Sequence, residues 1–156
     1  MFRRRRSTIP ETNAWSVVDP DPVGRNYHAF SLLLPDGRVV VLGSNPADGS
    51  FEMWMSIYEP PYLFQGNRPT VTAAPADTTH GQSFALGVTG AVVNASLMSP
   101  GSATHQTDTN LRLVARPITG SAGALTATVP TSRGLLPPGP YMLTVLDNQG
   151  VPSVTR

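Results

Sequence analysis

A hairpin pattern between residues 27 and 43 is the feature that most constrains the fold of this chain. The apolar run Tyr27–Leu34 leads into a short turn, and the β-branched run Val39–Gly43 follows it. Pro35 sets φ at the start of the turn, and Gly37 accepts the positive φ that closes it. This order of residues predicts two antiparallel strands and points to a β-rich fold.

Two more predicted strands flank this hairpin. Asn13–Val18 precedes it, with Trp15 as an aromatic anchor, and Phe51–Tyr58 follows it. A meander of four strands over roughly fifty residues has the size of one antiparallel propeller blade. One blade cannot bury both of its faces, so we expect a bare apolar face that packs against missing blades or another chain. The residues expected on that face are Phe30, Leu32, Leu34, Val39 and Val41.

The first thirteen residues are expected to form a solvated basic tail. Arg3–Arg6 could begin a secretory signal, but Ser7–Glu11 follow where the apolar segment of a signal peptide would be. We therefore expect no signal peptide in this chain. No stretch approaches the ~18 consecutive apolar residues that span a bilayer, so we also expect no membrane span.

The pattern changes after a stiff joint at Glu59–Leu63, where two prolines prevent a regular element from continuing. We place the domain boundary there: residues 1–64 form the tail and the blade, and residues 65–156 form a second domain. Short predicted strands separated by turns at about 8–12-residue intervals, with no helix signal, favour an immunoglobulin-like sandwich. The predicted strands are Thr70–Ala74, Ser83–Val88, Val92–Met98, Arg112–Ala115, Ala124–Val129 and Tyr141–Leu146.

Composition excludes several classes of protein. Only 13% of the residues are charged and the net charge is +1, so the chain lacks the basic stripe of a nucleic-acid binder. With 40% hydrophobic residues it can bury a core, which argues against a disordered chain. It contains no cysteine, so a disulfide or a cysteine-based zinc site is impossible within it.

Six motifs in order give the chain a family resemblance. From residue 25 to residue 153 it resembles the C-terminal part of galactose oxidase and glyoxal oxidase, the copper radical oxidases. The motifs are Arg25-x-Tyr27-His28, Leu32-Leu33-Leu34-Pro35-Asp36-Gly37-Arg38-Val39, Pro60-x-Tyr62-Leu63, Thr104-His105-x-Thr107-Asp108-x-Asn110, Pro137-Pro138-Gly139-x-Tyr141-Met142-Leu143 and Gly150-Val151-Pro152-Ser153.

The resemblance implies a fold and a metal site. The fold is the last blade of a kelch-like propeller followed by an immunoglobulin-like early-set domain. The site is a mononuclear copper centre, to which Tyr27 contributes an axial phenol and His28 an equatorial imidazole. His105, on a loop of the second domain, contributes a second imidazole. Two imidazoles and a phenol suit Cu(II).

The resemblance also implies an activity that this chain alone should lack. The family oxidises primary alcohols or aldehydes with O₂ and releases H₂O₂, and it uses a tyrosine cross-linked to a cysteine as a radical cofactor. That cofactor comes from an earlier blade, and a chain without cysteine cannot make it. We therefore expect a fragment that is inactive alone, from an extracellular or cell-surface enzyme whose substrate is a small alcohol, aldehyde or carbohydrate. The alternative is a non-catalytic immunoglobulin-like module for binding or assembly.

Each candidate residue also has a structural interpretation. Adjacent Tyr27 and His28 point to opposite faces of a regular strand, so both can reach one metal only if the backbone twists or bulges there. Outside its motif, His105 is more often a loop residue bonded to a neighbour such as Asp108 or Thr107. We expect Asp108 to cap backbone N–H groups of its loop. His80 is interpreted as structural, and Arg25 as an anchor of the blade through a two-point carboxylate contact.

Overall fold

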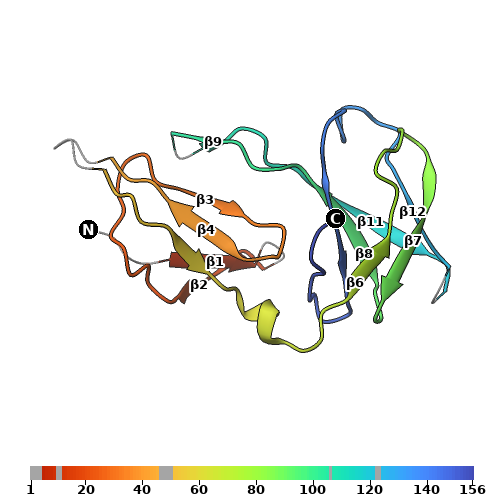
Figure 1. The fold of residues 1–156 in the computed structure, drawn as a ribbon, viewed down its shortest axis with the longest axis horizontal. Helices are drawn as coiled ribbons and strands as arrows, with labels where there is room; N and C mark the ends of the chain where they lie inside the picture. The colour runs from red at the N-terminus through yellow and green to blue at the C-terminus, as the bar shows by residue number, and fades with distance from the viewer. Residues whose placement is uncertain (1–4, 10–11, 46–50, 106, 122–123) are drawn as a thin grey trace.

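The computed structural model describes residues 5–9, 12–45, 51–105, 107–121 and 124–156. These residues form thirteen strands and one short 3₁₀ helix, η1 (Pro61–Phe64), which confirms the predicted all-β class. An N-terminal group of strands and a larger C-terminal group lie side by side, and η1 belongs to the segment that joins them (Figure 1). No helix in the described part of the chain is long and apolar enough to cross a membrane.

The predicted hairpin forms the centre of a three-stranded antiparallel sheet in the order β3-β4-β5. Strand β3 (Phe30–Leu33) pairs with β4 (Val39–Leu42), which pairs in turn with β5 (Ser56–Tyr58). Both outer strands are shorter than predicted. Tyr27 and His28 lie in a turn before β3, and the residues from Phe51 to Met55 form no regular strand.

The prediction of a four-stranded meander after a tail was wrong. Residues Arg5–Ile9 form a strand, β1, which pairs antiparallel with β2 (Ala14–Val18) in a separate two-stranded sheet. Asn13 has a positive φ of 49°, which asparagine tolerates better than most residues and which helps the chain turn back. A charged run that was expected to form a solvated tail is thus part of a strand, because its backbone groups form hydrogen bonds with β2. Because the sheet of β3, β4 and β5 has three strands rather than four, it does not by itself confirm a kelch-like blade, which stays a prediction.

The C-terminal group contains all six strands predicted for it, within a few residues of the predicted bounds. They form one continuous antiparallel ladder in the order β13-β8-β11-β12-β7-β6. The strands are β6 (Thr70–Ala73), β7 (Ser83–Thr89), β8 (Asn94–Met98), β11 (Leu113–Thr119), β12 (Leu125–Thr128) and β13 (Met142–Leu146).

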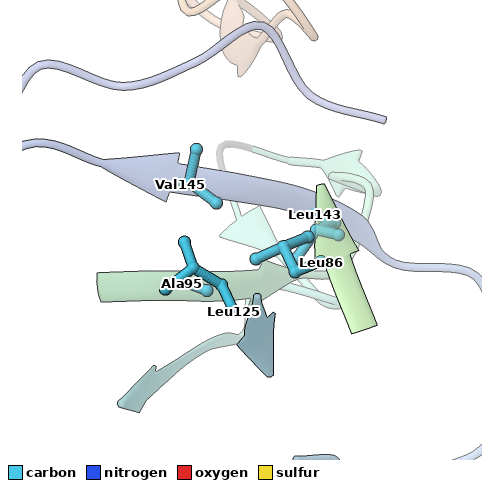
Figure 2. Packing of buried hydrophobic residues seen from close by; sticks show 5 residues of the cluster. All are labelled: Leu86, Ala95, Leu125, Leu143 and Val145. Atoms are coloured by element: carbon cyan, nitrogen blue, oxygen red, sulfur yellow. The ribbon is translucent and has the colours of Figure 1, made fainter. Parts of the chain in front are cut away.

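One strand turns this ladder into two layers. Strand β11 pairs with β8 as far as Pro117, and from Ile118 onward it pairs with β12. The ladder curls so that its two end strands, β6 and β13, contact each other. Apolar side chains from four strands fill the space inside, and Val145 is completely buried. Figure 2 shows the central cluster of Leu86, Ala95, Leu125, Leu143 and Val145.

Side chains or backbone N–H groups of Tyr62, Arg68 and Thr155 donate hydrogen bonds to backbone carbonyls around η1 and the C-terminal segment. The Tyr62 hydroxyl donates to the carbonyl of Gly37 at 2.5 Å. The Arg68 guanidinium donates to the carbonyls of Pro152 and Ser153 at 2.7 and 2.9 Å. The backbone N–H of Thr155 donates to the carbonyl of Pro35 at 2.8 Å. The boundary at residue 64 stays a prediction, but these contacts tie η1 to the first group, the segment after η1 to the second group, and the C-terminal segment to the first group.

The exposed apolar surface of the N-terminal group is not the one predicted. All five residues expected on a bare face are half-buried. Leu32 is covered by the backbone of Gly101, which approaches so closely that a Cβ there would lie 2.5 Å from Leu32 Cδ2. The large apolar side chains that are exposed belong mainly to the irregular segment before β5 and to β2. They include Trp15, Val17, Phe51, Met53, Trp54 and Met55.

We predict that Leu86→Ala lowers the free energy of unfolding by about 2–5 kcal/mol, because it leaves a cavity between the two layers. Leu113→Ala is the matched control, since Leu113 is also a strand leucine but is 63% exposed. Its expected cost is below about 1 kcal/mol. Urea unfolding of the two variants measures the difference, and equal losses would contradict the assignment of Leu86 to the core.

Candidate metal centre

Tyr27 and His28 occupy the middle of a tight turn that leads into β3. The N–H of Ala29 donates to the carbonyl of Asn26 at 3.2 Å, and His28 has a φ of 62°. A positive φ at the third turn position is the geometry of a type II turn, which usually needs glycine. For histidine the left-handed conformation costs about 1–3 kcal/mol, and such strain concentrates at functional sites. The irregular backbone that a shared metal would require at these two residues is present, in the form of a turn.

The segment after β4 holds this turn in place. The N–H of Asn26 donates to Ser44 Oγ at 2.9 Å, and the N–H of Asn45 donates to the carbonyl of Tyr27 at 2.6 Å. Gly43 packs against the carbonyl of His28, where a Cβ would lie 2.5 Å from the oxygen. A side chain at position 43 would therefore displace His28. The sequence pattern did not identify these residues, apart from a glycine at the end of the returning strand.

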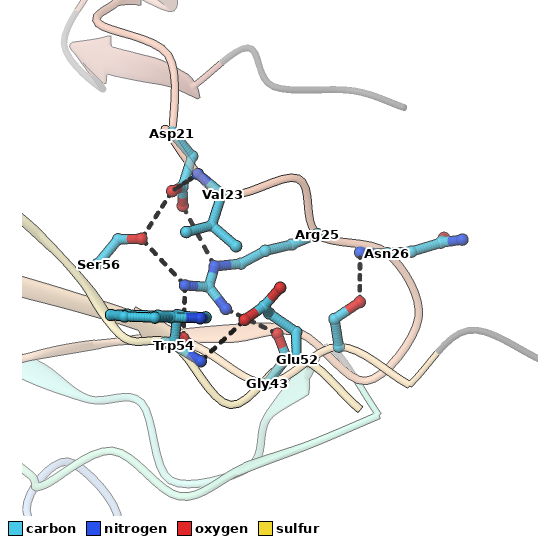
Figure 3. A network of polar contacts seen from close by, with 9 residues as sticks. Asp21, Val23, Arg25, Asn26, Gly43, Glu52, Trp54 and Ser56 are labelled. Carbon is cyan, nitrogen blue, oxygen red and sulfur yellow. Dashed lines mark hydrogen bonds and ion pairs between the residues drawn. The ribbon is translucent and has the colours of Figure 1, made fainter. Parts of the chain in front are cut away.

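Arg25 anchors the same region from the other side (Figure 3). Its Nε contacts Asp21 Oδ2 at 3.3 Å, and this pair is buried, with side-chain exposures of 7% and 9%. The remaining guanidinium nitrogens donate to Gly43, Trp54 and Ser56. Arg25 is an anchor, as predicted, but the predicted two-point carboxylate contact is wrong: one bond goes to a carboxylate oxygen, and the others go to two backbone carbonyls and a hydroxyl group. Removing one member of such a buried pair costs about 3–5 kcal/mol.

His105 reaches the turn on a ribbon that projects from the C-terminal group. Strands β9 (Ala103–Thr104) and β10 (Thr107–Asp108) form this ribbon, and β9 contacts β3 (Figure 1). Asp108 Oδ1 accepts the N–H of Ser102 at 3.1 Å and the N–H of Asn110 at 2.9 Å. The predicted capping role of Asp108 is therefore confirmed. The ribbon itself was not predicted, because two-residue strands leave no pattern in a sequence.

The ring of His105 is held by a neighbour in a way that leaves one nitrogen free for other contacts. Its Nδ1 is 2.8 Å from Thr104 Oγ1. The expected partner was Asp108 or Thr107, and in the structure it is Thr104. Like His28, His105 has a left-handed backbone, with a φ of 50°. Two of the four non-glycine residues with positive φ in the described part of the chain are thus the two predicted imidazole ligands.

The structure brings together the three rings that the sequence singled out. Tyr27 and His28 stack with ring centroids 3.8 Å apart, and His28 and His105 meet edge to face at 5.0 Å. The Nε2 atom of His28 is buried and has no hydrogen-bond partner among the residues that the structure describes. A buried imidazole nitrogen without a partner costs free energy unless something else uses it, and a metal ion is a natural partner. Imidazole and phenol are donors that fit copper.

No other candidate metal site competes with this one in the described residues. They contain no group of three or more histidine, cysteine, aspartate or glutamate side chains that could hold a metal ion. The remaining histidine, His80, bonds through Nε2 to the carbonyl of Leu136 at 2.6 Å, which confirms its structural role. It lines a cavity of about 970 Å³ at one end of the sandwich, and this cavity includes none of the three rings.

Comparison with known proteins places the chain in a family. Residues 68–156 match the model of the galactose oxidase-like early set domain. The chain belongs to this family. The resemblance inferred from the six motifs is thus confirmed, and so is the immunoglobulin-like early-set assignment of the C-terminal group.

Relatives of this galactose oxidase-like chain match nearly all of it. It is 32% identical to a galactose oxidase of Gibberella zeae, over 94% of this chain and 23% of that protein. It is also 32% identical to an aldehyde oxidase of Arabidopsis thaliana, over 93% of this chain and 28% of that protein. The chain therefore spans less than a third of the length of either relative.

A solved structure shares the arrangement of both groups of strands. It is that of a fungal alcohol oxidase of the AA5 family in complex with copper. The TM-score is 0.87 at 25% identity, and the match covers 99% of this chain and 35% of that one. The match includes nearly all of both groups of strands.

The Asp108 carboxyl provides a test of the ribbon geometry. Hydrogen bonds from the backbone N–H groups of Ser102 and Asn110 hold its pKa below the ordinary value of 3.8. Because the folded-state pKa is depressed, the stabilisation is present above the unfolded pKa and is lost as pH falls through the folded one. We predict that the amide proton shifts of Ser102 and Asn110 titrate together in NMR spectra, with a midpoint below 3.8.

The Asp108→Asn variant is the control for this titration. Asparagine keeps an acceptor oxygen for the same N–H groups but does not ionise. Both amide titrations should disappear in it. Their persistence, or a midpoint above 3.8 in the unmodified chain, would show that Asp108 does not hold the ribbon.

Proposed function

We propose that this chain is the C-terminal part of a copper radical oxidase, in which Tyr27, His28 and His105 bind copper. The observation that carries the proposal is the meeting of these three rings, one of which has a buried nitrogen, Nε2 of His28, without a hydrogen-bond partner in the described part of the chain. The residues come from two groups of strands and from positions 77 apart in the sequence, His28 and His105. The similar fungal alcohol oxidase is a complex with copper, which supports the choice of metal.

The intact enzyme would oxidise a primary alcohol or an aldehyde with O₂ and form H₂O₂. The similarity to a galactose oxidase and to an aldehyde oxidase supports this reaction class. When bound, copper would supply one of the two oxidising equivalents, and the cross-linked tyrosyl radical would supply the other.

The residues of this chain would have distinct roles. His28 and His105 would hold the metal through imidazole nitrogens, and the Thr104 contact to Nδ1 leaves Nε2 of His105 for that purpose. Tyr27 is 51% exposed, so its hydroxyl can meet a substrate from solvent. We assign Tyr27 Oη as the base that accepts the proton of the substrate hydroxyl group. The Tyr-Cys cofactor cannot be made in this chain, which has no cysteine.

Partners and location follow from the same proposal. The missing blades, or another chain, would cover the exposed apolar segment from Phe51 to Met55. The substrate of the intact enzyme would be a small alcohol, an aldehyde or a carbohydrate, and the enzyme would act outside the cell or at its surface.

A second candidate function is a non-catalytic module for binding or assembly. The exposed side chains of Trp15, Met53 and Trp54 favour it, because large exposed apolar patches mark interaction surfaces. Copper binding separates the two candidates. A module that binds no metal would gain nothing from the strained backbones of His28 and His105 or from the buried Nε2 atom of His28.

We predict that the chain binds one equivalent of Cu(II), measured by isothermal titration calorimetry in a weakly coordinating buffer. His28→Asn and His105→Asn should each weaken binding by at least about tenfold, because loss of a ligand costs more than loss of a supporting contact. Asparagine suits these positions because it tolerates a positive φ. Tyr27→Phe should remove any phenolate-to-copper absorption band.

His80→Gln is the matched control for copper binding, since His80 is the histidine outside the site. It should bind Cu(II) as the unmodified chain does. Weak binding that does not saturate, or binding that is unchanged in His28→Asn and His105→Asn, would favour the module.

We also predict no detectable H₂O₂ from the copper-loaded chain with galactose, glyoxal or methylglyoxal, because the Tyr-Cys cofactor is absent. A peroxidase-coupled assay with an intact galactose oxidase as positive control measures this. Copper-dependent turnover by the chain would refute the proposed need for the radical cofactor.

A further inference from the structure

We propose that Arg25 is a positioning residue that holds the Tyr27–His28 turn in the geometry needed to face His105. The inference rests on the proposed metal site, because it concerns the same residues. The family motifs give Arg25 no more than an anchoring role. The structure gives it three separate segments to hold, and one of these supports the strained histidine directly.

The buried carboxylate of Asp21 holds the guanidinium of Arg25 at its Nε atom. Asp21 Oδ2 contacts Arg25 Nε at 3.3 Å, and Asp21 Oδ1 accepts from the N–H of Val23 at 3.0 Å and from Ser56 Oγ at 2.7 Å. Asp21 and Ser56 are each only 6% exposed. The carboxylate is thus immobilised, so the arginine that pairs with it has little freedom.

The other side of the guanidinium joins two segments that are distant in sequence. Its Nη1 donates to the carbonyl of Gly43 at 2.9 Å. Its Nη2 donates to the carbonyl of Trp54 at 2.8 Å and to Ser56 Oγ at 3.0 Å. Figure 3 shows these bonds converging on one planar group. A lysine ammonium is a compact charge on a flexible stem, so it cannot reproduce this rigid fork.

The bond to Gly43 connects this network to the metal site. Gly43 packs against the carbonyl of His28, and the next two residues bond the backbone of Asn26 and Tyr27. A shift of Gly43 is therefore transmitted to His28 through direct contacts. Because the positive φ of His28 persists only while its surroundings enforce it, a loosened Gly43 would let His28 relax and turn its ring away from His105.

Arg68 offers a matched control elsewhere in the fold. Like Arg25, it uses a guanidinium to hold two backbone carbonyls, those of Pro152 and Ser153, at 2.7 and 2.9 Å. Its two carbonyl partners belong to the C-terminal group, as Arg68 itself does, and none of its described hydrogen bonds reaches the three rings. Arg68→Lys should therefore lower the stability of the fold by a similar amount but leave the placement of the His28 ring unchanged.

The experiment compares Arg25→Lys with Arg68→Lys by two measurements. The first is the set of NOEs between the His28 and His105 rings in the metal-free chain, whose centroids are 5.0 Å apart. The second is Cu(II) affinity, together with the copper EPR spectrum. Arg25→Lys should lose the inter-ring NOEs, weaken Cu(II) binding by about 10- to 100-fold and change the EPR parameters. Arg68→Lys should retain all three.

A milder variant keeps the test decisive if Arg25→Lys does not fold. Ser56→Ala removes one bond to Arg25 and one to Asp21. It should weaken the NOEs and the affinity in the same direction, but less. Ser56→Ala or Arg25→Lys with unchanged NOEs and an unchanged EPR spectrum would overturn the positioning role.

The two readouts also separate this inference from the proposed function. An unmodified chain that shows the NOEs but binds no Cu(II) would refute the metal site, and the loss of NOEs in Arg25→Lys would still support positioning. Absence of the inter-ring NOEs from the unmodified chain would refute positioning itself, since there would be no geometry for Arg25 to hold.

Discussion

The packing of the β9–β10 ribbon on strand β3 is the contact on which the candidate site depends. Gly101 lies at the base of the ribbon, where a Cβ would be 2.5 Å from Leu32 Cδ2 and 2.9 Å from Asp108 Oδ2. Only a residue without a side chain lets the ribbon lie this close to the sheet. The approach lets Asp108 cap the base of the ribbon and brings His105, near its tip, next to His28. A larger residue at position 101 would separate the two imidazoles.

Strands with an alternating pattern of apolar side chains were predicted from the sequence, whereas strands that depend mainly on backbone hydrogen bonds were missed. The six strands of the C-terminal group were found because their apolar residues alternate toward a core, as Leu143 and Val145 do in β13. Strand β1 was missed because a strand made from an arginine-rich run gives no apolar pattern. The half-burial of Leu32 was missed because its cover comes from a loop far away in the sequence.

The three candidate ligands came from motif resemblance, and their meeting could not have been derived from spacing. Tyr27 and His28 would point apart in a regular strand, and it is the turn with a left-handed His28 that stacks their rings. That turn depends on Gly43, Ser44 and Asn45, whose roles involve backbone contacts and a single hydroxyl group. Contacts of this kind leave little trace in composition or periodicity, so the supporting residues were invisible while the ligands themselves were recognised.

The segment after β13 has a consequence for how the whole chain unfolds. It turns back at Asp147–Gly150 and pairs with β13, where Ser153 and Arg156 bond the backbone of Val145 and Leu143. The same segment reaches the first group of strands through Thr155 and Pro35. Because this segment contacts both groups, unfolding of either group removes contacts that stabilise the other, so their stabilities are linked. A ligand that bridges His28 and His105 binds side chains from both groups, so by linkage it would stabilise both of them against separate unfolding.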